Sequence, residues 1–241
     1  MDEGLPRRAT AEFVGTGLLL VAVVGSGIMA ERLSGGIVAL ALLANAIATG
    51  GALYALILAF GPVSGAHFNP AVTIADASQG GLGWRDVPVY VLAQGTGALA
   101  GVAVAHGMFG LPIFSVSMHN RSGAAQALGE LIATFGLLAI IWGGSRRTPT
   151  AVPLAVAAYI TGAYWFTSST SFANPAVTLA RAVTNTFAGI RPVDVPGFIG
   201  AQLLGAAAAT ALFRWLLPHG SLELATDEVG PISGASGDRQ P

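Results

Sequence analysis

Apolar runs separated by short polar turns fill this chain from residue 10 to residue 217. A helix needs about 20 apolar residues to cross the hydrocarbon core of a membrane, and most of the runs approach that length. Only 10% of the 241 residues are charged, whereas soluble domains carry about 25% charge. We therefore expect a protein that crosses the lipid bilayer several times, with its backbone polar groups paired inside helices.

The apolar runs predict an all-α membrane protein with six transmembrane helices. We expect the spans at residues 10–29, 36–60, 86–106, 124–142, 152–167 and 194–217. Residues 1–9 are expected to form a cytoplasmic N-terminus, and residues 10–217 a single domain. Residues 218–241 hold too few apolar side chains to pack, so a polar, disordered tail is expected there.

Two segments, residues 62–78 and 167–187, are apolar but too short to span a membrane. Each contains Asn-Pro-Ala-Val-Thr, starting at Asn69 and at Asn174. Proline suits the first position of a helix, and asparagine suits the residue that caps it. A helix of about 8 residues is only about 12 Å long. The two segments are therefore predicted to be re-entrant half-helices, each preceded by an extended stretch.

The two halves of the chain repeat each other. Glu12 is matched by Glu130 and Gln94 by Gln202, and the two Asn residues lie 105 positions apart (174 − 69). Repeat one covers residues 10–107 and repeat two covers residues 124–217. Each repeat holds three spans, and three is odd, so the halves must be inverted relative to each other. Inverted repeats with broken helices place a solute site at the membrane midplane.

Two half-helices that meet tip to tip would make a pore for uncharged solutes. Each helix N-terminus carries a partial positive charge, which repels cations and interrupts a proton-conducting chain of water. Amide groups at the tips would donate to a solute oxygen, and upstream carbonyls would accept from its hydroxyls. The candidate tip residues are Asn69, Pro70, Ala71, Asn174, Pro175 and Ala176, and the candidate carbonyls are those of Gly65, Ala66, His67, Phe68, Phe172 and Ala173.

These motifs resemble the aquaporin, or major intrinsic protein, family. Residues 64–73 are similar to the family's first signature loop, and residues 171–176 to the second as far as the Ala. The likeness covers about residues 10–217. It implies a right-handed bundle of six helices and two half-helices, assembled as a homotetramer with one pore in each protomer.

The chain departs from the family at Val177, where members generally carry Arg. The family's spacing places the other residues of the narrowest ring, so the predicted selectivity filter is Thr49, Gly162, Ser171 and Val177. This ring has no charge and no aromatic side chain, which implies a wide aperture. Arg181, two turns along the half-helix, is not expected to replace the missing Arg.

Such a ring resembles that of bacterial channels associated with arsenic-resistance operons. The implied solutes are arsenous acid, antimonous acid and small methylated arsenicals, together with glycerol and water. The implied location is the bacterial inner membrane. Cytoplasmic termini would leave Arg7, Arg8, Arg85, Arg146 and Arg147 inside, against four Arg outside or near that face, which weakly fits the positive-inside rule.

Glu12 and Glu130 are intramembrane carboxylates, which are often functional, for example in proton coupling. Their symmetric placement favours another role, in which each accepts hydrogen bonds from a re-entrant loop.

The alternatives are an ordinary water channel, a coupled secondary transporter, and a membrane enzyme or non-conducting structural protein. The chain has no Cys and no clustered catalytic groups. We therefore expect no enzyme activity, no metal and no cofactor. The net charge of −1 argues against nucleic acid as a partner.

Overall fold

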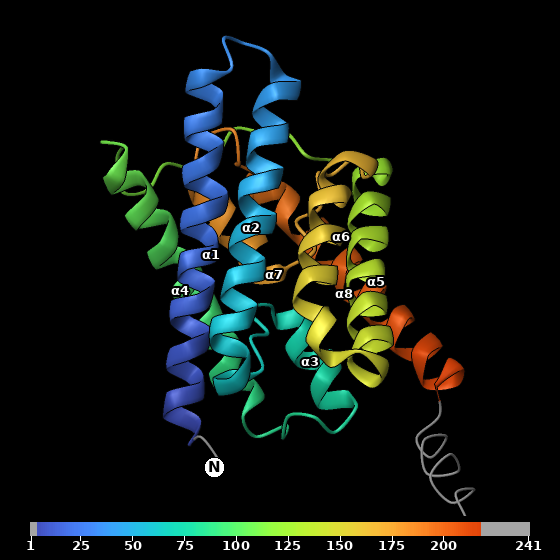
Figure 1. Cartoon of the computed structure of the whole chain (residues 1–241). Coiled ribbons are helices and arrows are strands. Elements are labelled where there is room, and N and C mark those ends of the chain that lie inside the picture. The colour runs from blue at the N-terminus through green and yellow to red at the C-terminus, as the bar shows by residue number, and fades with distance from the viewer. Residues whose placement is uncertain (1–3, 218–241) are drawn as a thin grey trace, which may run out of the picture.

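The fold is a bundle of long helices around two short ones, in a computed structural model that describes residues 4–217 (Figure 1). No strand occurs within those residues. The long helices are α1 (Leu5–Leu33), α2 (Val38–Ser64), α4 (Val87–Met108), α5 (Ala124–Arg147), α6 (Val152–Phe166) and α8 (Val195–Leu216). The short helices are α3 (Pro70–Ser78) and α7 (Pro175–Ala180), and single 3-10 turns lie at η1 (Pro149–Ala151), η2 (Arg181–Val183) and η3 (Pro192–Asp194).

Five segments of the described chain are long and apolar enough to cross a membrane: α1, α2, α4, α5 and α8 with η3. The sixth expected span, α6, is shorter at 15 residues, and η1 directly precedes it. The all-helical fold is thus confirmed, with one short member. Several helices extend beyond the expected spans: α1 begins at Leu5 and α5 continues to Arg147. A span ends where the apolar run ends, but the helix itself needs no apolar residues to continue. The predicted tail at 218–241 lies outside the described residues.

The two repeats have matching packing. In repeat one α1 packs against α2 and α4, and in repeat two α5 packs against α6 and α8, while α2 and α6 join the halves. Glycine permits the closest approaches. A Cβ on Gly101 would collide with the backbone of α1 at Gly17, and a Cβ on Gly205 would collide with the backbone of α5 at Leu131. Small residues at such crossings let membrane helices pack backbone to backbone.

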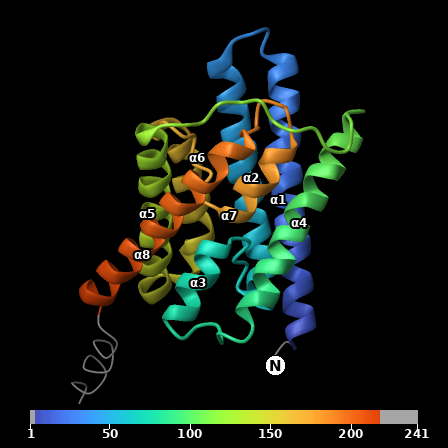
Figure 2. The ribbon, with the colours of Figure 1, turned by 180° about the vertical axis from the view of Figure 1, so that it is seen from behind.

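The half-helices α3 and α7 enter the bundle from opposite ends (Figures 1 and 2). Helix α3 lies in the lower half of Figure 1, where α1 begins and α8 ends, and α7 lies in the upper half. Both short helices, α3 and α7, pack on α4 and on α8, which are equivalent helices of the two repeats. The inverted arrangement predicted from three spans per repeat is therefore present.

Candidate functional site

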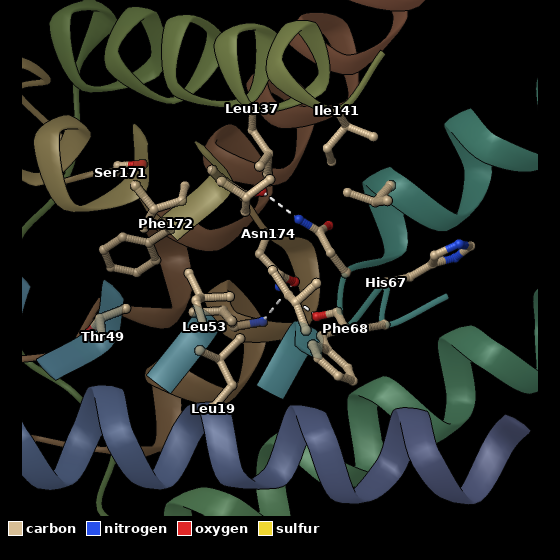
Figure 3. Close-up of a pocket in the computed structure, with 18 of the residues that line it drawn as sticks. Leu19, Thr49, Leu53, His67, Phe68, Leu137, Ile141, Ser171, Phe172 and Asn174 are labelled. Carbon is tan, nitrogen blue, oxygen red and sulfur yellow. Dashed lines mark hydrogen bonds between the residues drawn. The ribbon is translucent and has the colours of Figure 1, made fainter. Parts of the chain in front are cut away.

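A cavity of about 350 Å³ lies where the two half-helices meet (Figure 3). Its walls come from both repeats, and both Asn residues of the repeated motif line it. In Figure 3 His67 lies on one side of Asn174, and Thr49, Ser171 and Phe172 lie on the other. The cavity therefore passes the tips of the half-helices and reaches toward both ends of the bundle.

Asn69 and Asn174 cap their helices and bind to each other's loops. The Oδ1 of Asn69 accepts from the backbone N–H of Ala71 at 2.9 Å, and the Oδ1 of Asn174 accepts from Ala176 at 3.0 Å. Each Nδ2 donates to a carbonyl of the other repeat: Asn69 to Ala173 and Asn174 to Phe68, both at 2.7 Å. A side-chain amide has two N–H groups, so each Asn keeps one for a solute. The crossed bonds fix the two tips against each other.

The prediction that the loops before the half-helices are extended is wrong. Residues 66, 68, 171 and 173 have positive φ angles of 49°, although none is glycine. This left-handed conformation alternates with residues of ordinary negative φ. Successive carbonyls therefore do not point to opposite sides in turn, as they do in an extended strand. Non-glycine residues in this region are strained by about 1–3 kcal/mol each and concentrate at functional sites. All six candidate carbonyl residues line the cavity: Gly65, Ala66, His67, Phe68, Phe172 and Ala173.

Two fully buried carboxylates hold these strained loops. Glu12 accepts from the backbone N–H of His67 at 2.9 Å and of Phe68 at 2.7 Å. Glu130 accepts from Phe172 and Ala173, both at 2.8 Å. The carboxylates supply partners for backbone donors that a short loop inside the membrane cannot satisfy by itself.

A glutamine behind each loop completes the support. Gln94 donates to Glu12 and to the Thr73 hydroxyl, and Gln202 donates to Glu130 and to Thr178. Thr73 and Thr178 belong to the two half-helices. Each glutamate is thereby joined to its half-helix as well as to its loop, and the inverted repeat duplicates the whole network.

Three of the four candidate filter residues line the cavity: Thr49, Ser171 and Val177. The Ser171 hydroxyl is buried without a partner, so it is available to a solute. Gly162 lies outside the lining, and α6 instead contributes Val152, Val156, Ile160 and Tyr164. These four are spaced by four residues and share one helix face, whereas Gly162 lies between the last two and faces away. Tyr164 hydrogen-bonds to Thr49 at 3.1 Å.

Tyr164, Phe172 and Arg181 change the chemistry expected from sequence, because all three line the cavity. The expected aperture had no aromatic side chain and no arginine. Helical spacing carries a signal for two of them: Tyr164 is four residues from Ile160, and Arg181 is four residues from Val177. Arg181 follows one turn behind Val177 on the same face of the half-helix.

Two guanidinium groups lie against the ring of Phe172. The Arg181 carbon Cζ is 3.3 Å from the ring centroid, and that of Arg121 is 4.8 Å away. Arg181 also donates to the Ala188 carbonyl, and Arg121 donates to Gly189 at 2.8 Å. Burial lowers the pKa of Arg121 from its usual value, but a guanidinium stays protonated in proteins. The α7 end of the cavity is therefore positively charged.

The α3 end of the cavity has the opposite character. Asp76 and His67 both line it, with Nε2 of His67 3.7 Å from a carboxylate oxygen of Asp76. Among the described residues there is no group of three or more His, Cys, Asp or Glu side chains placed to hold a metal ion. This end therefore carries an acid and an imidazole.

Comparison with known proteins gives one family. Residues 3–158 match the family described as Major intrinsic protein. Aquaglyceroporin AqpS of Rhizobium meliloti (strain 1021) is 60% identical over 213 residues, which cover 88% of this chain and 91% of that protein. Probable aquaporin NIP7-1 of Arabidopsis thaliana is 41% identical over 53% of this chain and 46% of its own length. The crystal structure of the aquaglyceroporin from Plasmodium falciparum is similar in fold, with a TM-score of 0.65 at 20% identity, covering 92% of this chain and 98% of that one.

Proposed function

The chain belongs to the major intrinsic protein family, and from that premise we propose that it passes arsenous acid, antimonous acid and glycerol, along with water. The path is the cavity between the half-helices, and small methylated arsenicals belong to the same solute class. Flow is passive and follows the concentration gradient. Residues 10–217 act as one channel domain made of the repeats 10–107 and 124–217.

The observation that carries the proposal is the uncharged side chain of Val177 in the same cavity as both Asn tips. A long cationic side chain at this position would fill the aperture and bind the solute's oxygen atoms. Valine leaves that volume to the solute. Arsenous acid is uncharged at neutral pH and resembles a small polyol, so its hydroxyls match the acceptors and donors that glycerol would use.

Each part of the cavity has a role in this proposal. The free N–H groups of Asn69 and Asn174 donate to a solute oxygen at the centre, and the loop carbonyls and the Ser171 hydroxyl accept from solute hydroxyls. Glu12 and Glu130 brace the loops and do not touch the solute. The tips contribute to the exclusion of cations through their helix dipoles.

A second candidate, an ordinary water channel, is favoured by Tyr164. This ring lines the cavity and bonds to Thr49, so it takes up room that Gly162 would have left open. A bulky aromatic at this point narrows the passage and would favour water over larger solutes.

Stopped-flow light scattering of proteoliposomes distinguishes the two candidates. Vesicles are shocked separately with arsenous acid at neutral pH, with glycerol and with an impermeant sugar. Shrinkage followed by rapid reswelling in both test solutes supports the proposal. Rapid water exit without reswelling in either solute makes the protein a water channel, and protein-free vesicles set the background.

We also propose a homotetramer in the bacterial inner membrane with cytoplasmic termini. The described chain starts and ends at the same end of the bundle (Figure 1). The side chains of Arg7, Arg8, Arg146 and Arg147 belong to helix ends there, which agrees with the positive-inside rule. Cross-linking in native membranes, which should give a band at four times the protomer mass, tests the assembly.

A further inference from the structure

The inverted repeat places two opposite charges at equivalent positions of the cavity. Asp76 is seven residues after Asn69, and Arg181 is seven residues after Asn174. Both line the cavity, Asp76 at the α3 end and Arg181 at the α7 end. We propose that this pair gives the channel its ion exclusion, with Arg181 as the barrier to cations and Asp76 as the barrier to anions. The proposal rests on the channel function proposed above.

Arg181 is held in place without an acidic partner. Only 2% of its surface is exposed, its guanidinium stacks on Phe172, and it donates to the carbonyl of Ala188. No carboxylate lies within 4.0 Å of its guanidinium in the described part of the chain, in contrast to Arg8, which pairs with Asp86, and Arg191, which pairs with Asp194. Its positive charge is therefore not neutralised by direct contact, and the cavity experiences it.

Asp76 cannot be explained by the stability of its own helix. It lies near the C-terminus of α3, where the helix dipole is negative and disfavours a carboxylate. Its backbone carbonyl accepts from Gly81, but its carboxylate has His67 as its ion partner among residues 4–217, at 3.7 Å. The side chain is 24% exposed and lines the cavity.

The two charges add to the barrier that the half-helix tips provide. Val177 removes the cation at the aperture, and Arg181 returns a positive charge one helical turn away. The half-helix N-termini are partly positive and would stabilise an anion at the centre. A negative charge at Asp76 opposes the passage of that anion, whereas an uncharged solute meets neither barrier.

The two charges are far enough apart to act separately. Seven residues of helix correspond to about 10 Å from each Asn, so roughly 20 Å separates the backbone positions of the two residues. Coulomb attraction falls with distance, so at such a separation it is about one fifth of its strength at 4 Å. Each charge therefore controls its own end of the cavity instead of cancelling the other.

Ion conductance of the purified protein in planar bilayers, under a KCl gradient, tests the pair. Arg181→Gln is expected to raise ion conductance by about tenfold or more, because a unit charge a few Å away changes the local ion concentration by that order. The reversal potential of this variant should have the sign of a cation-selective pore. Arg181→Lys keeps the charge and should stay as ion-tight as the wild type. Asp76→Asn should also raise conductance, but its reversal potential should have the sign of an anion-selective pore.

Arg32→Gln is the matched control. Arg32 also stacks on a phenylalanine, with its Cζ 5.1 Å from the ring of Phe109, and donates to the Phe109 carbonyl at 3.2 Å. It does not line the cavity, so its loss should leave conductance at the wild-type level. Glycerol reswelling of vesicles made from the same preparations reports whether each variant is folded.

Three results overturn the proposal: Arg181→Gln vesicles that pass glycerol yet stay ion-tight, equal leak in Arg181→Lys and Arg181→Gln, or no anion leak in Asp76→Asn. If Arg181→Gln does not reconstitute, the nearly isosteric Asp76→Asn decides, since a rise in anion conductance supports the pair and no rise rejects it. A wild-type protein that passes no glycerol contradicts the proposed function. The ion conductances of the variants relative to the wild type then still test the roles of Arg181 and Asp76.

Discussion

Replacing Glu130 with Gln should destabilise the protein, because the carboxylate is the acceptor for three donors. Its oxygens accept from the backbone of Phe172 and Ala173 and from the side chain of Gln202. A glutamine can turn only one oxygen toward these donors, and its NH₂ group must face at least one of them. The variant loses the charge and leaves a buried N–H without an acceptor.

The magnitude follows from these bonds. A hydrogen bond to a charged group contributes about 1.5–3 kcal/mol, and a buried donor left unsatisfied costs about 1–3 kcal/mol. A loss of about 3 kcal/mol in the free energy of unfolding is therefore expected. For a chain of 150–250 residues, each kcal/mol lowers Tm by about 2–4 °C, so the melting temperature should fall by about 6–12 °C.

Thermal unfolding in detergent, followed by tryptophan fluorescence at one scan rate, measures this fall. Glu12→Gln should behave similarly, because Glu12 makes the equivalent bonds in repeat one. Glu31→Gln is the control, since Glu31 lies on the same helix but is exposed. A fall of less than about 2 °C in both buried variants would refute the idea that the carboxylates hold the loops.

Three further substitutions test the pore. Val177→Arg should reduce glycerol and arsenous acid flux by about tenfold or more while water flux falls less, since about 1.4 kcal/mol of added barrier suffices; equal reduction of all three fluxes would argue against a filter role. Tyr164→Ala should raise the glycerol-to-water permeability ratio. Gly162→Ala should leave that ratio unchanged, because the added Cβ would meet Phe166 at an ordinary 3.6 Å. The reverse pattern would indicate that Gly162, and not Tyr164, is the filter residue of α6. Asn174→Ala should lower unfolding stability by about 1–2 kcal/mol through loss of the helix cap, measured by thermal unfolding, and an unchanged Tm would contradict the capping role.

The repeat made the fold predictable from sequence. Two copies of Asn-Pro-Ala in segments too short to span, together with three spans in each half, require inverted half-helices, and the structure has them. The paired glutamates were informative for the same reason. Symmetric placement of Glu12 and Glu130 argues for support of a loop, and the hydrogen bonds of both carboxylates have that form.

The walls of the cavity were harder to predict than its centre. Counting twelve residues back from Asn174 reaches Gly162, but which face of α6 points inward depends on how that helix packs against α2 and α5. Spacing puts Arg181 on the same helix face as Val177, but it does not show where the long side chain ends: the guanidinium stacks on Phe172 and lines the cavity. Positive φ at the non-glycine residues 66, 68, 171 and 173 has no sequence signature, since the crossed Asn bonds and the glutamates impose it.

Equilibrium uptake of radiolabelled glycerol into proteoliposomes, with and without an imposed pH gradient, tests the passive channel most directly. We predict that uptake is faster than in protein-free vesicles and stops, in both conditions, when the internal and external concentrations are equal. Accumulation above the external concentration under the pH gradient would contradict a passive channel and identify the protein as a coupled transporter.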